Sequence, residues 1–340
     1  MTRPELTTLI AKGCLRDVDL TGCELTDIDF GKCTLEGVSF DEGTLTGCNF
    51  DGCTLRRVSL RKATLRNCRF RNAAISWSDF RYCEIDRATF EAARIEFCDF
   101  YRAMLGGVVI MRKALIADTS LYYTYLCEGV NIRRENLAEG RLLQEDREAY
   151  RRFLVEWNTR GTGVRRNDRA GQSDWDPEAS LRARWADAEE IYKNLSGLWC
   201  SRGFLHDANW AYVKGRRMER RRMMADWRST PALRRPALAC RIANNLLMDL
   251  LFGYGESMRR MIFTYAALVL LFAYIFYGNA SLPSYLNAFW ISLKNMAGVG
   301  SEQLDGISPL VDMLNVTQTT LGILLTGIFG FILGNKIRNQ

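Results

Sequence analysis

A period of five residues runs through the first third of the chain. Leu, Phe or Ile stands at every fifth position from Leu20 to Ile110, and a small or compact residue precedes each by two positions, as Cys23 precedes Leu25. A helix repeats every 3.6 residues and a strand every two, so neither places all these side chains on one face. The chain must coil so that every fifth side chain returns to the same interior.

This pattern resembles the pentapeptide-repeat family. The resemblance implies an N-terminal right-handed quadrilateral β-helix with four pentapeptides per coil, in which the central Leu or Phe and the small residue both point inward. The register breaks after Leu115, and residues 124–126 and 130–132 are expected to form a last, irregular coil. We therefore expect residues 1–132 to form this domain. We expect the domain to be cytosolic, because the N-terminus has no apolar core of signal-peptide length.

Cysteine is unusually frequent at the small inward position. A metal or redox centre needs ligands that converge on one point, whereas these residues are spread along a column, where cysteine acts as a small hydrophobe. We expect the column to be structural, with no metal and no cofactor. Its members are Cys23, Cys33, Cys48, Cys53, Cys68, Cys83 and Cys98.

Residues 56–71 carry seven basic side chains and no acid, which raises the alternative of nucleic-acid binding. A coil of twenty residues stacks each residue about 4.8 Å from the residue twenty positions away. Arg56 would then lie over Glu36, and Lys62 over Glu42. The pattern favours a ladder of surface ion pairs, and we expect no nucleic acid as a partner.

Residues 133–258 are predicted to form an α-helical linker domain, a cytosolic collar. Arg133–Arg160 has the pattern of a charged helix, and Pro177 suits a helix start. A pair of helices, roughly 178–201 and 207–228, should follow and turn at Gly203. Five aromatic or apolar residues at helical spacing are candidates for the seam of that pair: Tyr192, Leu195, Trp199, Trp210 and Tyr212.

The segment from Lys214 to Arg241 contains ten basic residues and only two acidic ones. A solvated helix face would explain them, but a membrane span follows, so we favour contact with anionic lipid headgroups. The residues predicted to face lipid are Arg216, Arg217, Arg220, Arg221, Arg222, Arg234 and Arg235.

Residues 259–340 are predicted to form a two-helix transmembrane hairpin. Met261–Tyr277 and Val316–Gly334 contain no charge, and at 1.5 Å per residue they reach about 25–29 Å, enough to cross the hydrocarbon core. Basic residues on the outer flanks place both termini in the cytoplasm of a multi-pass inner-membrane protein. Those residues are Arg259, Arg260, Lys336 and Arg338.

The loop between the spans carries the functional signal. Ser284–Met296 is amphipathic and too short to span, as a re-entrant pore helix would be, and a G-x-G segment follows. Span, short helix, G-x-G and span together resemble the two-transmembrane potassium-channel family. The resemblance implies a homotetramer and a selectivity filter made of Met296, Ala297, Gly298, Val299 and Gly300.

The chain departs from that family at the base of the filter. Met296 stands where the family has a threonine, and a thioether is a poor ligand for alkali cations. We therefore expect weak discrimination between monovalent cations. Gly327 or Gly330 could act as a gating hinge, although simple helix packing explains glycine equally well. The predicted outer mouth consists of Glu302, Asp305 and Asp312.

The resulting hypothesis is a homotetrameric, weakly selective cation channel controlled by its cytosolic repeat domain, to which an unidentified protein or ligand would bind. The alternative is a non-conducting scaffold that is anchored in the membrane and binds a protein partner through the β-helix. We find no nucleophile–base set, phosphate loop or metal cluster in the sequence, so an enzyme is not expected.

Overall fold

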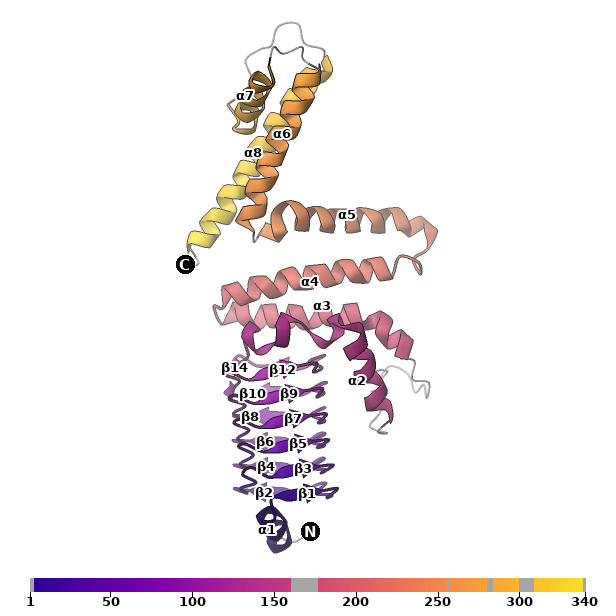
Figure 1. The fold of residues 1–340 in the computed structure, drawn as a ribbon, viewed down its shortest axis with the longest axis vertical. Coiled ribbons are helices and arrows are strands. Elements are labelled where there is room, and N and C mark those ends of the chain that lie inside the picture. Colours follow the sequence, from indigo (N-terminus) through magenta and orange to yellow (C-terminus); the bar gives the residue numbers. More distant parts are fainter. Residues whose placement is uncertain (1–2, 160–176, 256, 280–283, 300–308, 339–340) are drawn as a thin grey trace. The chain divides into compact units, whose positions relative to one another are not determined.

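The computed structural model describes residues 3–159, 177–255, 257–279, 284–299 and 309–338. Two compact units are present, Met1–Arg228 and Ser229–Gln340, and each is described by itself (Figure 1). The domain boundaries predicted after residues 132 and 258 stay predictions.

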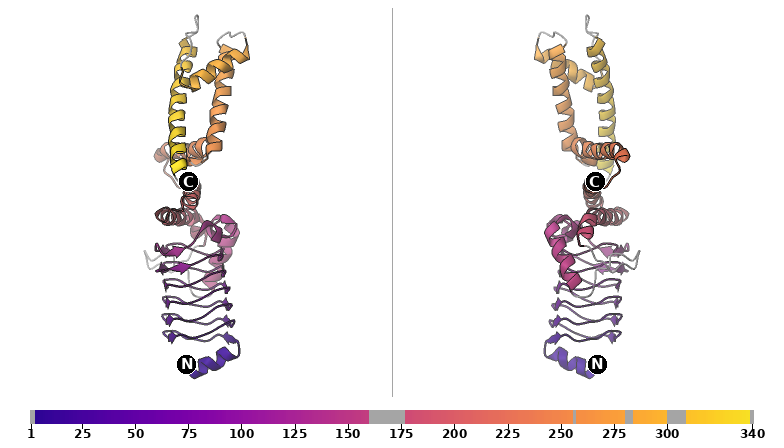
Figure 2. Two further views of the ribbon diagram at one scale, coloured as in Figure 1. Left: turned by 90° about the vertical axis from the view of Figure 1, so that its left-hand side faces the viewer. Right: turned by 90° about the vertical axis from the view of Figure 1, so that its right-hand side faces the viewer.

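The first unit begins with a short helix, α1 (Arg3–Ala11), and continues as a β-solenoid (Figures 1 and 2). Two parallel sheets of six strands follow the orders β1-β3-β5-β7-β9-β12 and β2-β4-β6-β8-β10-β13, which gives about six turns. The strands are β1 (Cys14–Arg16), β2 (Glu24–Thr26), β3 (Thr34–Glu36), β4 (Thr44–Thr46), β5 (Thr54–Arg56), β6 (Thr64–Arg66), β7 (Ala74–Ser76), β8 (Glu84–Asp86), β9 (Arg94–Glu96), β10 (Met104–Gly106), β11 (Val109–Ile110), β12 (Leu115–Ala117), β13 (Tyr125–Leu126) and β14 (Val130–Asn131).

The predicted coil of twenty residues is confirmed. Cys14 of β1 pairs with Thr34 of β3, and the same spacing recurs along both sheets. Single bridges at the positions between the strands, such as Asp19 with Ser39 and Asp29 with Asn49, add two further ladders. The solenoid therefore has four faces, as the repeat implied.

Stacked aromatic rings fill the interior of the solenoid. The rings of Phe30, Phe50, Phe70 and Phe90 lie one above another with centroids 4.6 to 4.8 Å apart and nearly parallel planes. Thiols fill the small positions beside them, and the Sγ of Cys53 donates to a main-chain carbonyl at 3.4 Å. Burial raises the pKa of that thiol to about 12, so it stays protonated and unreactive.

The expected end of the regular register is wrong by about one pentapeptide. Strand β10 still pairs with β8 at a spacing of twenty residues, but β12 pairs with β9 at twenty-one. One residue is therefore inserted between them, at Val108, whose side chain is 59% exposed. Val109 and Met111 are buried in place of the expected Val108 and Ile110. An inserted residue turns the following side chains to the opposite face.

The predicted helix over Arg133–Arg160 is only half correct. Three 3-10 turns come first, and helix α2 (Arg147–Thr159) follows. The side-chain amide of Asn136 donates to the carbonyls of Met111 and Ala114, in the coil that follows the inserted residue, so this segment caps the solenoid. Leu137 and Leu142 are buried in the solenoid core for the same reason. The turns are η1 (Arg134–Asn136), η2 (Ala138–Gly140) and η3 (Leu143–Glu145).

The predicted helix pair is present as α3 (Pro177–Ser201) and α4 (Leu205–Ala225). The chain turns at Gly203, whose φ of +74° suits glycine. Tyr192, Leu195 and Trp199 are buried in the seam, and Trp210 packs edge-on against the ring of Tyr192. Tyr212 is 47% exposed, so its assignment to the seam was wrong.

The second unit is entirely helical in its described residues (Figure 2). Helices α6 and α8 contain stretches, Met258–Gly278 and Val311–Gly334, that are long and apolar enough to cross a membrane. These are candidate spans. The elements are η4 (Ala232–Arg234), α5 (Arg235–Phe252), η5 (Gly253–Gly255), α6 (Met258–Asn279), α7 (Tyr285–Met296) and α8 (Pro309–Arg338).

Helix α5 was not predicted, and it meets α6 at a hydrogen-bonded turn. Gly253 and Tyr254 both have positive φ and end the helix. The guanidinium of Arg260 donates to the carboxylate of the buried Asp249 at 2.8 Å, and Tyr254 donates to Asn245 at 2.6 Å. These bonds fix the direction in which the first candidate span leaves α5.

Candidate functional site

The short helix between the candidate spans has defined ends. The Oγ of Ser284 accepts the backbone N–H of Leu286 at the first turn. At the other end, Gly298 has φ +74°, and the N–H of Val299 reaches the carbonyl of Lys294 at 3.1 Å. This is a Schellman closure. Helix α7 has 12 residues, so it is about 18 Å long, too short to cross the hydrocarbon core.

Buried polar side chains tie α7 to both candidate spans. Ser292 donates to the carbonyl of Val269 on α6 at 2.7 Å, and Gln318 on α8 donates to Ser292 Oγ at 2.6 Å. Asn295 donates to the side-chain oxygens of Gln318, at 3.2 Å, and of Asn315. Ser292, Asn295 and Gln318 have no exposed surface. Polar groups of this kind, between otherwise apolar helices, fix how the helices pack.

A glycine lets the end of α7 approach α8. A Cβ added to Gly322 would lie 2.7 Å from the Cα and 2.8 Å from the carbonyl carbon of Met296, which no real side chain tolerates. The side chain of Met296 is fully buried and packs with Val269 and Leu325. In the single chain this thioether therefore lies among the packed helices, and its place at the base of a filter stays a prediction.

The other described residues of the predicted filter lie at the surface. Ala297 is helical, with φ −76° and ψ −6°, and caps α7. Gly298 is exposed, and Val299 is 75% exposed. Gly300 lies outside the described residues. The structure thus brings Ala297–Val299 together as the exposed end of a helix.

The remaining predicted pore residues are divided between described and undescribed segments. Asp312 is exposed in the first turn of α8, whereas Glu302 and Asp305 lie outside the described residues. Gly327 and Gly330 are exposed within α8, with no heavy atom within 4 Å of an added Cβ. Helix α8 continues through both glycines, and a hinge there stays a prediction.

Several arginines predicted to face lipid have partners within the protein. Arg216 pairs with Glu219 at 2.5 Å, and Arg222 pairs with Glu189 at 2.9 Å. The guanidinium of Arg221 lies over the ring of Trp185. In the second unit, Arg234 and Arg235 are exposed. Lipid contact by Arg217 and Arg220, on α4, also stays a prediction.

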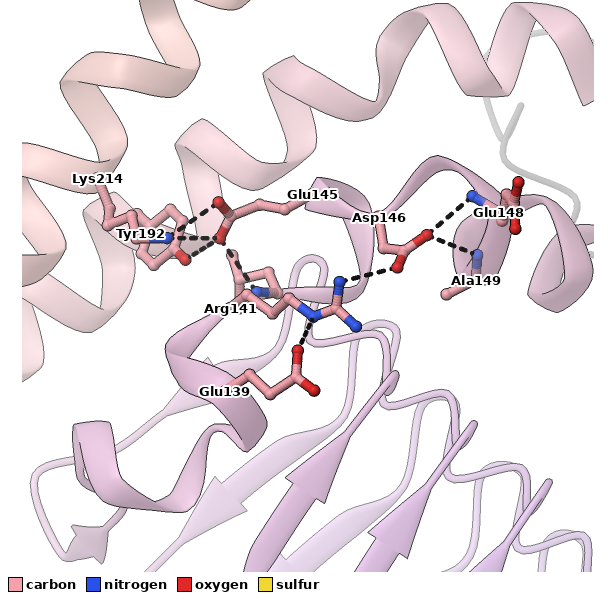
Figure 3. Close-up of polar contacts among 9 residues, drawn as sticks. Glu139, Arg141, Glu145, Asp146, Glu148, Ala149, Tyr192 and Lys214 are labelled. Atoms are coloured by element: carbon pink, nitrogen blue, oxygen red, sulfur yellow. Dashed lines mark hydrogen bonds and ion pairs between the residues drawn. The ribbon is translucent and has the colours of Figure 1, made fainter.

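A second polar site joins the cap of the solenoid to the helix pair (Figure 3). The carboxylate of Glu145 accepts hydrogen bonds from the backbone N–H of Leu142 and from Lys214 Nζ, at 3.0 Å, and from the hydroxyl of Tyr192. Burial raises the pKa of Tyr192 far above its usual range, so the phenol remains a donor. Glu145 therefore fixes both α3 and α4 on the cap.

The neighbouring Asp146 fixes α2 in the same way (Figure 3). Its Oδ1 accepts the backbone N–H groups of Glu148 and Ala149 at the start of the helix, and its Oδ2 pairs with Arg141 at 2.8 Å. The hydrogen bond from Ala149 is the main reason that the pKa of Asp146 is lowered. Two consecutive acids thus hold three helices on the end of the solenoid.

Sequence reasoning missed the residues that assemble the hairpin. Gln318 and Asn315 are polar positions inside an otherwise apolar segment, and Ser292 and Asn295 lie three residues apart on the short helix. That spacing places the latter two on one helical face. Polar residues inside a span usually serve packing or function, so this signal was available.

Residues 20–64 match the family model of pentapeptide repeats. The chain carries a pentapeptide-repeat β-solenoid. Among solved structures, the chain is similar to a pentapeptide-repeat protein from the thylakoid lumen of Arabidopsis thaliana, with 22% identity over 32% of this chain and 70% of that one, and a TM-score of 0.23. It is also similar to HetL from the cyanobacterium Nostoc, with 14% identity over 42% of this chain and 93% of that one, and a TM-score of 0.16.

A search of curated proteins gave no match. The pentapeptide-repeat match covers no residue of the candidate spans or of α7. Any function of the second unit must therefore be argued from its own side chains.

Proposed function

We propose that the chain is one subunit of a homotetrameric cation channel in the inner membrane, with a cytosolic pentapeptide-repeat solenoid that controls opening. Helix α7 is the observation that supports this most strongly. It is too short to span, and buried hydrogen bonds hold it between two candidate spans. A membrane anchor needs neither the short helix nor the polar cluster, whereas a pore loop needs a rigid support.

The exposed surface of the hairpin suits lipid and neighbouring subunits. Phe263 is 74% exposed, Tyr274 70% and Val316 60%, and apolar surface of this extent requires a partner other than water. Ala297, Gly298 and Val299 are exposed in the single subunit, so they are available to a ring of four. The number four comes from the resemblance to two-transmembrane channels.

Weak discrimination among monovalent cations remains the expectation, for a changed reason. With the Met296 side chain buried, no side-chain oxygen is available where the potassium-channel family has a hydroxyl. Only backbone carbonyls would contact an ion at this level. The exposed Asp312, with Glu302 and Asp305, would raise the local concentration of cations at the mouth.

The second candidate function is a non-conducting scaffold that is anchored in the membrane and binds a protein through the solenoid. The Schellman closure at Gly298 favours it, because a G-x-G that merely ends a helix needs no conduction path. The basic residues Arg234 and Arg235 near the first span would anchor either molecule on the cytoplasmic side.

Ion flux distinguishes the two functions. Purified chain in liposomes should pass K⁺ and Na⁺, and cross-linking should give tetramers. Gly298→Val should abolish flux and leave the tetramer intact, because a β-branched residue strongly disfavours φ +74°. The matched control is Gly278→Val, where φ is not positive and an added Cβ meets nothing within 4 Å. Tetramers without flux in the unmodified protein would support the scaffold instead.

A further inference from the structure

A groove of about 520 Å³ lies within the first unit, between the last coil of the solenoid and the C-terminal half of α3. The coil contributes a wall that includes Tyr123, Tyr125 and Glu128, and α3 contributes a wall that includes Glu190 and Gly197. Pockets for small ligands have volumes of roughly 300–1,000 Å³. The groove is therefore large enough for a small organic molecule or a few side chains of a peptide.

Exposed tyrosines form the solenoid wall of the groove. Tyr125 is 61% exposed and Tyr123 is 37% exposed, and Tyr123 contacts Tyr101 in a cluster of aromatic rings. The guanidinium of Arg102 lies over this cluster, 5.4 Å from the ring centroid of Tyr101 and 5.9 Å from that of Tyr82. The aromatic cluster thus already holds one cation through its ring faces.

The charged residues that line the groove are both acidic, although the whole chain has a net charge of +7. Burial raises the pKa of Glu190, and Lys193, one turn further along α3, opposes that shift. Within the described part of the chain, neither Glu128 nor Glu190 forms a hydrogen bond or an ion pair. Two carboxylates are therefore left to face a ligand.

Gly197 is the feature of the groove that packing does not explain. It lies inside α3, where glycine is a poor helix former, yet an added Cβ would meet no heavy atom within 4 Å. Gly215 on α4 differs, because its added Cβ would contact the side chain of Tyr192 at 3.4 Å. Gly215 serves the helix seam, whereas Gly197 leaves room in the groove and bares the helix backbone.

We propose that this groove binds an organic cation with an ammonium or guanidinium group, either a free polyamine or the side chain of a basic peptide. The charged end would lie between Glu128 and Glu190, and the alkyl stem would pack on Tyr123 and Tyr125. Aromatic faces beside carboxylates suit an organic cation better than a hard metal ion, which prefers a full set of oxygen ligands. Binding here does not depend on whether the second unit conducts.

Calorimetry on the full-length chain in detergent micelles tests this site, with spermidine and an arginine-containing hexapeptide as the two probes. The variant Glu128→Gln/Glu190→Gln should weaken binding on the order of tenfold or more, because it removes both charges and keeps the side-chain shapes. Gly197→Leu, which fills the groove, should do the same. The control Glu24→Gln/Glu84→Gln changes two exposed acids of the solenoid strands and should leave the affinity unchanged.

Binding of spermidine alone identifies a free organic cation, and binding of the peptide alone identifies a basic segment of a partner. Either result supports the site if the groove variants weaken it and the control does not. The inference is overturned if neither probe binds, or if the groove variants and the control bind equally well. Ion flux is not measured in this experiment, so its outcome is separate from that of the proposed channel.

Discussion

Replacing Gly322 by alanine should separate α7 from α8. The added methyl would lie 2.7 and 2.8 Å from backbone atoms of Met296, where real Cβ atoms essentially never come closer than 3.0 Å. The helix end must therefore move, which costs about 1–3 kcal/mol as overpacking. The hydrogen bond of 3.2 Å between Asn295 and Gln318 would stretch as well, and its loss adds roughly 1 kcal/mol.

We therefore expect the free energy of unfolding of the hairpin to fall by about 2–4 kcal/mol. Titration with denaturing detergent in mixed micelles, followed by circular dichroism, measures this quantity. Gly327→Ala is the matched control on the same helix, because its added Cβ meets nothing within 4 Å. Alanine there should be neutral or stabilise the helix by up to about 1 kcal/mol. Equal stability of Gly322→Ala and the unmodified protein would refute the close contact.

Three further predictions concern the solenoid. Phe50→Ala should lower the stability of the solenoid to chemical denaturation by about 3–5 kcal/mol, because the ring stacks between those of Phe30 and Phe70. Phe50→Leu should lose much less stability. Similar losses of stability in the two variants would argue against the aromatic column. Burial raises the pKa of Asp99 to about 6, above its unfolded value near 3.8. The free energy of unfolding should therefore fall by up to about 3 kcal/mol as the pH rises from 4 to 6. If Asp99→Asn shows the same dependence of stability on pH, this carboxyl is excluded as the cause. Under native conditions a thiol reagent should label the exposed Cys200 rapidly and the buried Cys48 only on unfolding. Cys48→Arg should unfold the domain, because it buries an unpaired charge. Rapid labelling of both thiols would contradict the inward column.

The solenoid could be predicted because its repeat is strictly local. Each pentapeptide has the same pattern of inward and outward side chains. The stacking of Phe50 on Phe30 can therefore be predicted from the spacing of twenty residues alone. The prediction failed at Val108, where Ile110 keeps the apolar period although one residue has been inserted before it. Apolar residues at both Val109 and Ile110 satisfy either register, and only pairing with the coil below decides between them.

The polar contacts of the helical regions could not be predicted in the same way. Glu145 contacts Tyr192 and Lys214, which lie 47 and 69 residues further along the chain, and nothing in the local pattern links them. The close approach of the Met296 backbone to α8 depends on the glycine at position 322, one turn beyond Gln318. The local pattern predicts the lengths and the apolar character of the two candidate spans. The rotation of each helix about its own axis depends on these distant contacts.

The central claim is that four copies of this chain conduct cations across a membrane. Single-channel recording from purified protein in a planar bilayer, with a salt gradient, tests it most directly. We predict discrete currents whose reversal potential lies on the cation side and changes little when Na⁺ replaces K⁺. A bilayer that stays silent with assembled tetramers present, or a reversal potential on the anion side, would contradict the claim.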